Sequence, residues 1–402
     1  MSLRLGFHYH VPALSLNGQI FLPGYLGRFI DSLATHCEEV VCFLHAPLPG
    51  EHVLIDYPVR SAKVSLIDIG PHVSVPRRLL SSRQVASKIR NECQGLDVML
   101  IRGPTPLMAT IAQAVEGVPV ALLLVGDYLA GVNDLPQPYW RKEAVRLWAW
   151  WNYRQQLRLA RRSLTLVNSR LLYEQLQPLV PELHEVRTTT LTSNDFFIRE
   201  DTCQTPPYHL LYTGRMDRAK GLFEMVEAIA LLVSQGEDVI LDLVGWPAEN
   251  DSIMTELANL AQARGVSEQV IYHGYKQVGP ELFAYYKQGD VFVIASRSSF
   301  EGFPRSIWEA MAHSLPVVAT RVGSIPYFLG GAVEFIEQND GNCLAASIRK
   351  ILHDQARRRH LIQAGSRMAR ENTLEVQGEK LIGIINRWLD KKHGKNSQAC
   401  KA

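Results

Sequence analysis

The chain has 402 residues, enough for two domains of ordinary size that each bury a core. Its composition, 47% hydrophobic and 20% charged, is that of a soluble globular protein, and a formal net charge of +2 gives no general reason to expect nucleic-acid binding. The six cysteines are scattered without a C-x-x-C pair. That pattern is typical of reduced thiols and argues against a disulfide framework or a zinc site.

Two stretches bear on where the protein works. The N-terminus, MSLRLGFHYH, carries charge and histidines where a secretory signal needs an apolar core. The longest apolar run, at 118–125, is far shorter than the roughly 20 residues that span a bilayer. We therefore expect a cytoplasmic protein that is neither exported nor inserted in a membrane.

The first half alternates short apolar runs with helical patterns. Strands are predicted at 3–8, 39–45, 96–102 and 118–127, and an amphipathic helix at 27–37 follows the first of them. Continuous apolar strands separated by helices indicate a parallel sheet covered on both faces. The fold class is therefore α/β.

The same rhythm restarts in the second half. Strands are predicted at 209–215, 238–245, 269–275 and 290–296, each followed by a helical pattern. The chain is thus predicted to form two doubly wound, Rossmann-like domains.

Composition suggests where these domains meet. The segment at 199–208, REDTCQTPPY, combines charge, threonines and a Pro-Pro pair without an apolar period, which is typical of a linker. We place an N-terminal domain at 1–198 and a C-terminal domain at 209–374. A final amphipathic helix at 375–391 is expected to pack back on the first domain.

Two carboxylates flank the turn after the predicted strand at 290–296. Ligands of open parallel sheets bind beyond the carboxyl ends of the strands, and Glu301 lies in that loop. Pro304 suits the first helical position, which puts Glu309 about 8 Å farther along the helix at 1.5 Å per residue. The free N–H groups near Gly302, Phe303 and Pro304 form an anion site at the helix N-terminus.

A second strand end carries two cations. Arg215 ends the predicted strand at 209–215, and Lys220 starts the next helix, a combination that suits a diphosphate. Each alone is more commonly a solvated surface residue. Together with the two acids, they give an order of groups that matches a nucleotide sugar. The alternatives are an i,i+4 pair of Glu309 with Arg305 and a glycosidase-type acid pair, which leaves both cations unexplained.

The stretch from Tyr272 to Pro326, with GRMDRAKG upstream, resembles the C-terminal domain of family 4 retaining glycosyltransferases of the GT-B fold. The resemblance is specific over 209–330 and includes the E-x7-E motif. It implies a nucleotide-diphosphate sugar as donor, no metal, and the following roles: Glu301 as catalytic and sugar-binding; Gly302, Phe303 and Pro304 near the sugar; Glu309 on the ribose; Arg215 and Lys220 on the diphosphate; Gly274, Tyr275 and Lys276 around the base.

The N-terminal half departs from that family pattern in two places. The first β-to-α loop usually has a Gly-Gly pair, and here Gly24 matches the first glycine while Tyr25 replaces the second. Gly24 is assigned to the diphosphate and Gly27 to a close backbone approach, with a plain turn glycine as the alternative. A histidine often follows the strand at 118–127, where this chain has Asp127. That carboxylate either helps deprotonate the acceptor or caps the next segment.

His8 and His10 share a face of the first predicted strand. A two-histidine metal site lacks an evident third ligand and a D-x-D motif, so we interpret both as polar residues at the mouth of the cleft.

Two stretches are rich in basic residues, at 77–90 and 140–162, and the second is interleaved with tryptophans. This pattern suits an anionic membrane surface and would place the protein peripherally on the inner face of the plasma membrane. A helix with inward tryptophans and solvated arginines explains the second stretch equally well.

These features and the resemblance together predict a glycosyltransferase, which the resemblance implies to be retaining and metal-independent. It would move a sugar from a nucleotide-diphosphate sugar to a glycan or lipid-linked acceptor, in cell-surface polysaccharide or glycolipid biosynthesis. The alternatives are a sugar-nucleotide epimerase or phosphorylase on the same fold, and a non-catalytic nucleotide-sugar-binding subunit.

Overall fold

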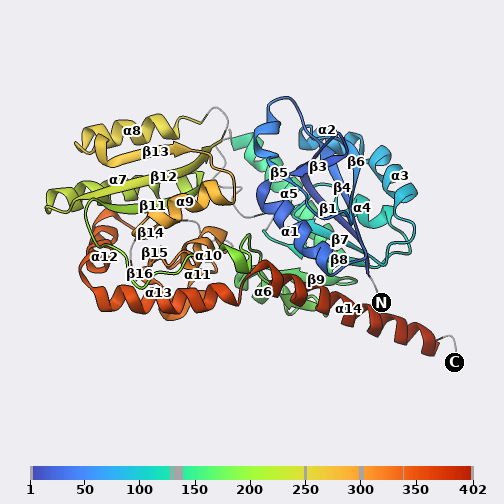
Figure 1. Cartoon of the computed structure of the whole chain (residues 1–402). Coiled ribbons are helices and arrows are strands. Elements are labelled where there is room, and N and C mark those ends of the chain that lie inside the picture. Colours follow the sequence, from blue (N-terminus) through green and yellow to red (C-terminus); the bar gives the residue numbers. More distant parts are fainter. Residues whose placement is uncertain are drawn as a thin grey trace. The chain divides into compact units, whose positions relative to one another are not determined.

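The structure, a computed structural model, describes residues 3–126, 129, 139–248, 251–297, 303–337 and 339–399. The chain divides into two compact units (Figure 1). The first comprises Met1–Thr188 together with Leu374–Ala402, and the second comprises Thr189–Thr373. Among the described residues, no helix is both long and apolar enough to cross a bilayer.

The first unit is built on a parallel sheet of seven strands in the order β10-β9-β8-β7-β1-β4-β6. Its strands are β1 (Arg4–Pro12), β4 (Glu39–Ala46), β6 (Val64–Pro71), β7 (Val98–Gly103), β8 (Val120–Leu124), β9 (Leu164–Val167) and β10 (Leu183–Glu185). A small antiparallel sheet contains β2 (Leu14–Leu16), β3 (Gln19–Leu22) and β5 (Tyr57–Pro58). Phe7 of β1 lies opposite Cys42 of β4 and Leu100 of β7, so β1 is central in the sheet.

Helices cover both faces of this sheet, as predicted for a buried parallel sheet. They are α1 (Gly24–Thr35), α2 (Val75–Leu80), α3 (Ser82–Glu92), α4 (Met108–Ala114), α5 (Tyr139–Ala160), α6 (Arg170–Leu176) and α14 (Leu374–Ala399), with the 3-10 helix η1 (Glu51–Leu54). The neighbours Leu100 and Ile101 are both fully buried, yet they belong to two different core clusters. Successive side chains of β7 therefore point to opposite faces of the sheet, and each face has its own core.

The final helix, α14, packs beside α1 within the first unit (Figure 1). Leu381 and Ile385 of α14 are buried in the same core cluster as Leu33 of α1. Gly378 permits the close approach, because a Cβ there would lie 2.8 Å from Ser32 Oγ. This helix contains the segment 375–391 that was predicted to pack on the N-terminal domain.

The second unit is a six-stranded parallel sheet in the order β13-β12-β11-β14-β15-β16. Its strands are β11 (Tyr208–Met216), β12 (Val239–Pro247), β13 (Val270–Gly274), β14 (Val291–Ile294), β15 (Val317–Thr320) and β16 (Glu334–Ile336). Its helices are α7 (Leu222–Ser234), α8 (Ile253–Ala263), α9 (Pro280–Gln288), α10 (Arg305–Ala312), α11 (Ile325–Leu329), α12 (Gly341–His353) and α13 (Gln355–Arg370), with η2 (Ser193–Asp195), η3 (Arg218–Lys220), η4 (Ser267–Gln269) and η5 (Gly330–Ala332). Two core clusters again lie on the two faces.

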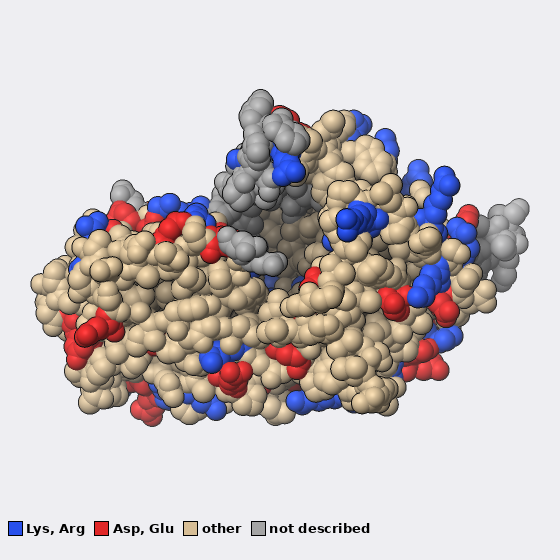
Figure 2. All heavy atoms as spheres, turned by 90° about the horizontal axis from the view of Figure 1, so that it is seen from above, with Lys and Arg blue, Asp and Glu red and all other residues tan. Residues whose placement is uncertain are grey.

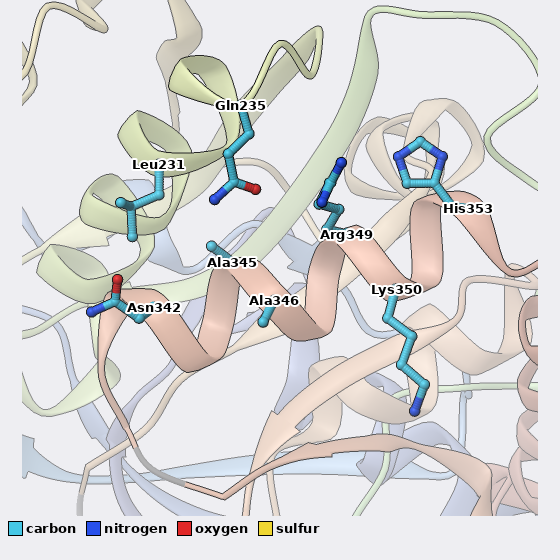
Figure 3. A pocket seen from close by; sticks show the side chains of 8 residues that line it. All are labelled: Leu231, Gln235, Asn342, Ala345, Ala346, Arg349, Lys350 and His353. Carbon is cyan, nitrogen blue, oxygen red and sulfur yellow. The ribbon is translucent and has the colours of Figure 1, made fainter.

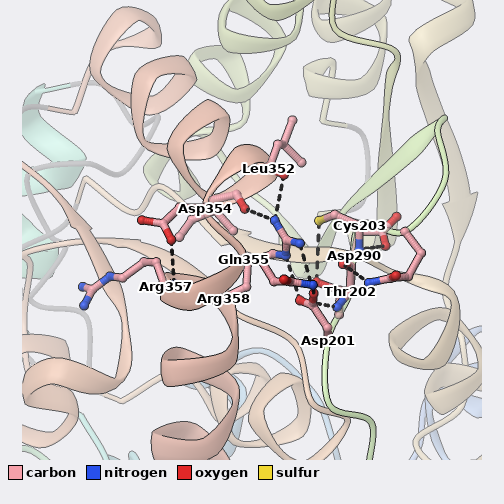
Figure 4. A network of polar contacts seen from close by, with 11 residues as sticks. Asp201, Thr202, Cys203, Asp290, Leu352, Asp354, Gln355, Arg357 and Arg358 are labelled. Atoms are coloured by element: carbon pink, nitrogen blue, oxygen red, sulfur yellow. Dashed lines mark hydrogen bonds and ion pairs between the residues drawn. The ribbon is translucent and has the colours of Figure 1, made fainter.

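The segment 199–208, predicted as a linker, groups with the second unit and is held there by buried polar contacts (Figure 4). The side chains of Asp201 and Arg358 are 5% and 6% exposed, and Arg358 Nε lies 2.8 Å from Asp201 Oδ1. The Cys203 amide donates to Asp290 Oδ1 at 2.8 Å. The segment has the polar composition of a free linker, yet its Asp201 is the ion-pair partner of the buried Arg358.

Candidate active site

The carboxyl ends of β11, β12 and β14, and the turn that follows β11, lie close together in the second unit. A Cβ at Gly221 would lie 1.9 Å from the carbonyl oxygen of Ala295, and one at Gly245 would lie 1.7 Å from that of Gly214. Gly221 also has a φ of +72°, which favours glycine. The backbone at this edge is therefore so closely packed that no side chain fits at these positions.

The structure brings Arg215 and Lys220 into this one turn. Arg215 lies at the end of β11 with its side chain 65% exposed and 4.0 Å from Asp217. Lys220 ends the short helix η3, and α7 begins two residues later at Leu222, slightly beyond the predicted helix start. The intervening Arg218 is bound instead to Asp251 at 2.7 Å and to Glu256 at 2.5 Å.

Sequence reasoning missed a third cation at this edge. Arg297, which follows β14, forms an ion pair with Glu224 in the first turn of α7. The Arg297 amide also donates to the carbonyl of Ala219 at 2.8 Å. These two contacts join the loop after β14 to the turn that carries Lys220. The positions of Glu224 and Arg297, 73 residues apart in the sequence, gave no signal of a pair.

Glu309 lies in α10 and is 5% exposed. Tyr286 Oη donates to its Oε2 at 2.8 Å, and Thr190 Oγ1 donates to its Oε1. Arg305 is not its partner, so the alternative of an i,i+4 pair is not realised. Because a carboxylate has about four acceptor positions, these two hydroxyls leave capacity for a further pair of donors.

The hydroxyl of Tyr286 extends this network to the strand that carries Arg215. It lies 2.5 Å from Thr213 Oγ1, near the end of β11. Burial, and then the charge of Glu309, raises the pKa of Tyr286 well above its usual value. Tyr286 therefore stays protonated and donates to Glu309.

The loop before α10 is described only from Phe303 onward. Pro304 is the N-cap and Arg305 the first helical residue, so Pro304 lies one position earlier than predicted. Phe303 is buried and stacks on Trp308, with ring centroids 4.3 Å apart. The predicted sugar-binding residues Glu301 and Gly302 lie outside the described residues.

Of the three residues predicted near the base, Gly274 ends β13, and Tyr275 and Lys276 follow it. Gly274 has a φ of +72°, and the Tyr275 ring lies edge-on to Trp246, with centroids 5.2 Å apart. Lys276 Nζ is 3.5 Å from Glu281. Trp246, at the end of β12 and 37% exposed, was not predicted. Its indole is an accessible surface of the kind on which nucleobases stack.

In the first unit, Gly24 begins α1, and its amide donates to Asp56 Oδ1 at 3.1 Å. A phosphate would have to displace that bond. Gly27 packs against Tyr57 of β5, since a Cβ there would lie 2.2 Å from the ring, and this contact by itself accounts for a glycine at the position. Asp127, the candidate base toward the acceptor, lies outside the described residues.

His8 is fully buried in β1 and committed to internal contacts, with Nδ1 2.8 Å from Phe43 O and Nε2 3.1 Å from Thr105 Oγ1. It is therefore not at the mouth of a cleft. His10 is only half-buried. Among the described residues, no group of three His, Cys, Asp or Glu side chains is arranged to hold a metal ion.

A groove of about 690 Å³ lies between α7 and α12, away from the strand ends (Figure 3). Leu231 of α7 and Gln235, the C-cap of that helix, line one side, and the other labelled side chains come from α12. Its cations are already neutralised, because Arg349 lies 2.9 Å from Glu237 and Lys350 lies 2.7 Å from Glu334. We therefore do not assign it to a charged ligand.

Comparisons with known proteins agree with this architecture. Residues 194–368 match the family described as "Glycosyl transferases group 1". Sucrose-phosphate synthase from Thermosynechococcus elongatus has a similar structure, with a TM-score of 0.73, 19% identity, and coverage of 97% of this chain and 100% of that chain. HepE from Anabaena, in complex with UDP and glucose, gives a TM-score of 0.71, 16% identity, and coverage of 96% and 100%.

Curated relatives match over shorter stretches. D-inositol 3-phosphate glycosyltransferase of Arthrobacter sp. (strain FB24) is 37% identical over 118 residues, which are 29% of this chain and 27% of the relative. The capsular polysaccharide biosynthesis glycosyltransferase CapM of Staphylococcus aureus is 27% identical over 194 residues, 46% of this chain and 47% of the relative. The chain thus spans about a quarter to a half of the length of these relatives.

Two parallel α/β units with neighbours of this kind define the GT-B fold. Within that fold class, residues 194–368 are similar to the group 1 glycosyltransferases.

Proposed function

We propose that the chain is a retaining glycosyltransferase that moves a sugar from a nucleoside diphosphate sugar to a glycan or lipid-linked acceptor. The observation that carries the proposal is the turn at the carboxyl edge of the second sheet. There Arg215 and Lys220 lie beside a tightly packed glycine backbone, in the segment that matches the family. A nucleotide sugar explains all three side chains, because its diphosphate would contact Arg215 and Lys220 and its ribose would contact Glu309.

The donor is held by residues of the second unit. Arg215 and Lys220 stabilise the charge that develops on the leaving diphosphate, a role that other enzymes give to a metal ion. Glu309 accepts hydrogen bonds from the ribose diol, and Glu301 binds the transferred sugar. The similar HepE structure holds UDP and glucose, so UDP-glucose is the first donor to test.

Relatives suggest the biosynthetic setting. Matching proteins include glycosyltransferases of capsular polysaccharide and teichuronic acid biosynthesis and an O-antigen chain mannosyltransferase. We therefore place this chain in cell-surface polysaccharide or glycolipid synthesis in the cytoplasm, with Asp127 as the candidate base on the acceptor side.

A peripheral membrane contact through α5 fits a lipid-linked acceptor. Leu147, Trp150 and Trp151 of α5 are 68%, 45% and 51% exposed, and the Arg154 guanidinium lies 4.8 Å from the Trp150 ring centroid. On the face shown in Figure 2, the described basic and acidic side chains are interspersed. A membrane contact confined to α5 is therefore favoured over one that involves the whole face. Arg78, in the other basic stretch, is buried and takes no part.

Products distinguish this function from its alternatives. The purified chain is incubated with each of a panel of nucleoside diphosphate sugars and a mixed glycan and lipid-linked acceptor fraction. Free nucleoside diphosphate with a glycosylated acceptor supports transfer. An interconverted donor sugar indicates an epimerase, a sugar phosphate indicates a phosphorylase, and donor binding without any product indicates a binding subunit.

A further inference from the structure

A cluster of polar side chains lies in the first unit, where four neighbouring strands reach the carboxyl edge of the sheet. The strands are β7, β1, β4 and β6, which are adjacent in that order. They contribute Arg102 from β7, His10 from β1, His45 from β4, and His72 directly after β6. Arg78 of α2 joins them. Ligands of open parallel sheets bind at this edge.

Contacts connect the members of this cluster. Arg102 Cζ lies 4.8 Å from the centroid of the Tyr9 ring, and that ring lies 4.3 Å from the ring of His10. Arg78 Nη1 donates to the carbonyl of His10 at 3.3 Å. On the other side, the rings of His45 and His72 are 5.8 Å apart.

The cluster contains buried nitrogen atoms without partners. Arg78 and Arg102 are 7% and 6% exposed, and the Nε atom of each has no hydrogen-bond partner among the described residues. Within the described part of the chain, no carboxylate forms an ion pair with either guanidinium. His45 is 2% exposed, and none of the described atoms is a partner of its Nε2. Buried polar groups are almost always satisfied, so a concentration of exceptions indicates a missing binding partner.

The hydrogen bond of His45 determines whether its unpartnered nitrogen is a donor or an acceptor. His45 Nδ1 lies 3.1 Å from the carbonyl of Gly70, so Nδ1 carries the proton and Nε2 is an acceptor. Burial lowers the pKa of His45 and of His10 to about 4, which keeps both rings neutral near pH 7. The site thus offers guanidinium donors beside a neutral imidazole acceptor.

We propose that this cluster binds an anionic sugar, that is, a sugar carrying a phosphate or a carboxylate, as the acceptor or its terminal residue. Arg78 and Arg102 bind the anion, and His45 accepts a hydrogen bond from a sugar hydroxyl. Tyr9, His10 and His72 are only half-buried, so the ligand reaches the site past them. The role as acceptor rests on the proposed function, whereas the binding of an anionic sugar does not.

Calorimetric titration of the full chain, without donor, tests the proposal. The probes are glucose 6-phosphate, glucuronate, glucose and inorganic phosphate. We expect glucose 6-phosphate or glucuronate, or both, to bind at least tenfold more tightly than glucose. A preference for the first identifies phosphate and a preference for the second identifies carboxylate. If neither anionic sugar binds more tightly than glucose, the proposal is wrong.

Charge-neutralising variants locate the binding. Arg78→Gln and Arg102→Gln should each weaken binding of the preferred anionic sugar roughly ten- to hundredfold, the effect of losing a charge-assisted hydrogen bond. Arg90→Gln, on the exposed surface of α3, removes the same charge and should leave binding unchanged. Equal effects of all three variants would overturn the assignment.

Further measurements separate misfolding, and failure of the proposed function, from failure of the site. Thermal unfolding shows whether each variant folds, and Arg78→Gln carries the test if Arg102→Gln does not, because Arg102 also packs on aromatic rings. Tight binding of an anionic sugar by a chain that transfers nothing leaves the site standing and removes the proposed function. If the chain transfers a sugar to neutral acceptors but binds no anionic sugar, the proposed function stands and the proposed site is wrong.

Discussion

Tyr286 Oη donates a hydrogen bond to Glu309 Oε2 across 2.8 Å, and both side chains are buried in the second unit. The bond connects α9 with α10 and, through Thr213, with the end of β11. It holds the carboxylate proposed for the ribose in one orientation relative to β11, the strand that carries Arg215. Tyr286 is thus a positioning residue that acts through Glu309.

Tyr286→Phe should weaken UDP binding roughly ten- to hundredfold, because a hydrogen bond to a charged group contributes roughly 1.5 to 3 kcal/mol. The loss should disappear when 2′,3′-dideoxy-UDP replaces UDP, since that ligand offers no diol. Tyr327→Phe, a 54% exposed side chain of α11, is the matched control. An equal loss with both nucleotides would show that Tyr286 supports the fold and not the ribose contact.

The pair Arg358 and Asp201 should dominate the stability of the segment that enters the second unit. Arg358 also donates to the carbonyls of Ile351 and Leu352 at the end of α12, at 2.9 and 2.7 Å. Arg358→Ala leaves Asp201 buried without its partner and should lower the free energy of unfolding by about 3 to 5 kcal/mol. Urea denaturation measures this change.

Arg359→Ala, which removes an exposed arginine from the same helix, should change that free energy by less than about 0.5 kcal/mol. Arg358→Lys should not restore stability, because an ammonium cannot reproduce the forked contact with Asp201. Full stability of Arg358→Ala would show that the ion pair contributes nothing to the fold.

The contact of His209 with Asp242 predicts a pH dependence of stability. His209 Nδ1 lies 2.7 Å from Asp242 Oδ2, and the hydrogen bond to that carboxylate raises the pKa of His209 above its usual value. A raised folded pKa stabilises the fold below the unfolded pKa of about 6.5, and this contribution disappears as the pH rises through the folded pKa.

His209→Gln should therefore destabilise the protein more at pH 6 than at pH 9, as measured by urea denaturation at both values. His360→Gln, on the exposed surface of α13, is the matched control. A difference between His209→Gln and the parent chain that is the same at both pH values, or larger at pH 9, would contradict the assignment.

Much of the architecture could be predicted because it depends on local pattern. The apolar run at 290–296 and the run at 209–215 correspond to β14 and β11, and both sheets are parallel. The placement of Arg215 and Lys220 at a strand end follows from the same pattern. Glu309 was found by its spacing from Glu301 within a motif.

The remaining features depend on contacts between distant segments. Thr190 and Glu309 are 119 positions apart, and a threonine carries no sign of its partner. The segment containing Asp201 has the composition of a free linker. Its buried carboxylate can be identified only once the fold places Arg358 opposite it. Arg78 belongs to a basic stretch and was assigned to the surface, yet α2 turns its side chain inward.

The most direct measurement of the central claim is the rate of nucleoside diphosphate release coupled to acceptor glycosylation, for the parent chain and two neighbouring variants. Lys220→Ala should lower kcat/KM roughly a hundredfold or more, because it removes a cation that stabilises the leaving diphosphate. Arg218→Ala removes a cation from the same turn that is paired with Asp251 and Glu256, and it should change the rate less than about threefold. Full activity of Lys220→Ala, or an equal loss in both variants, would contradict the account.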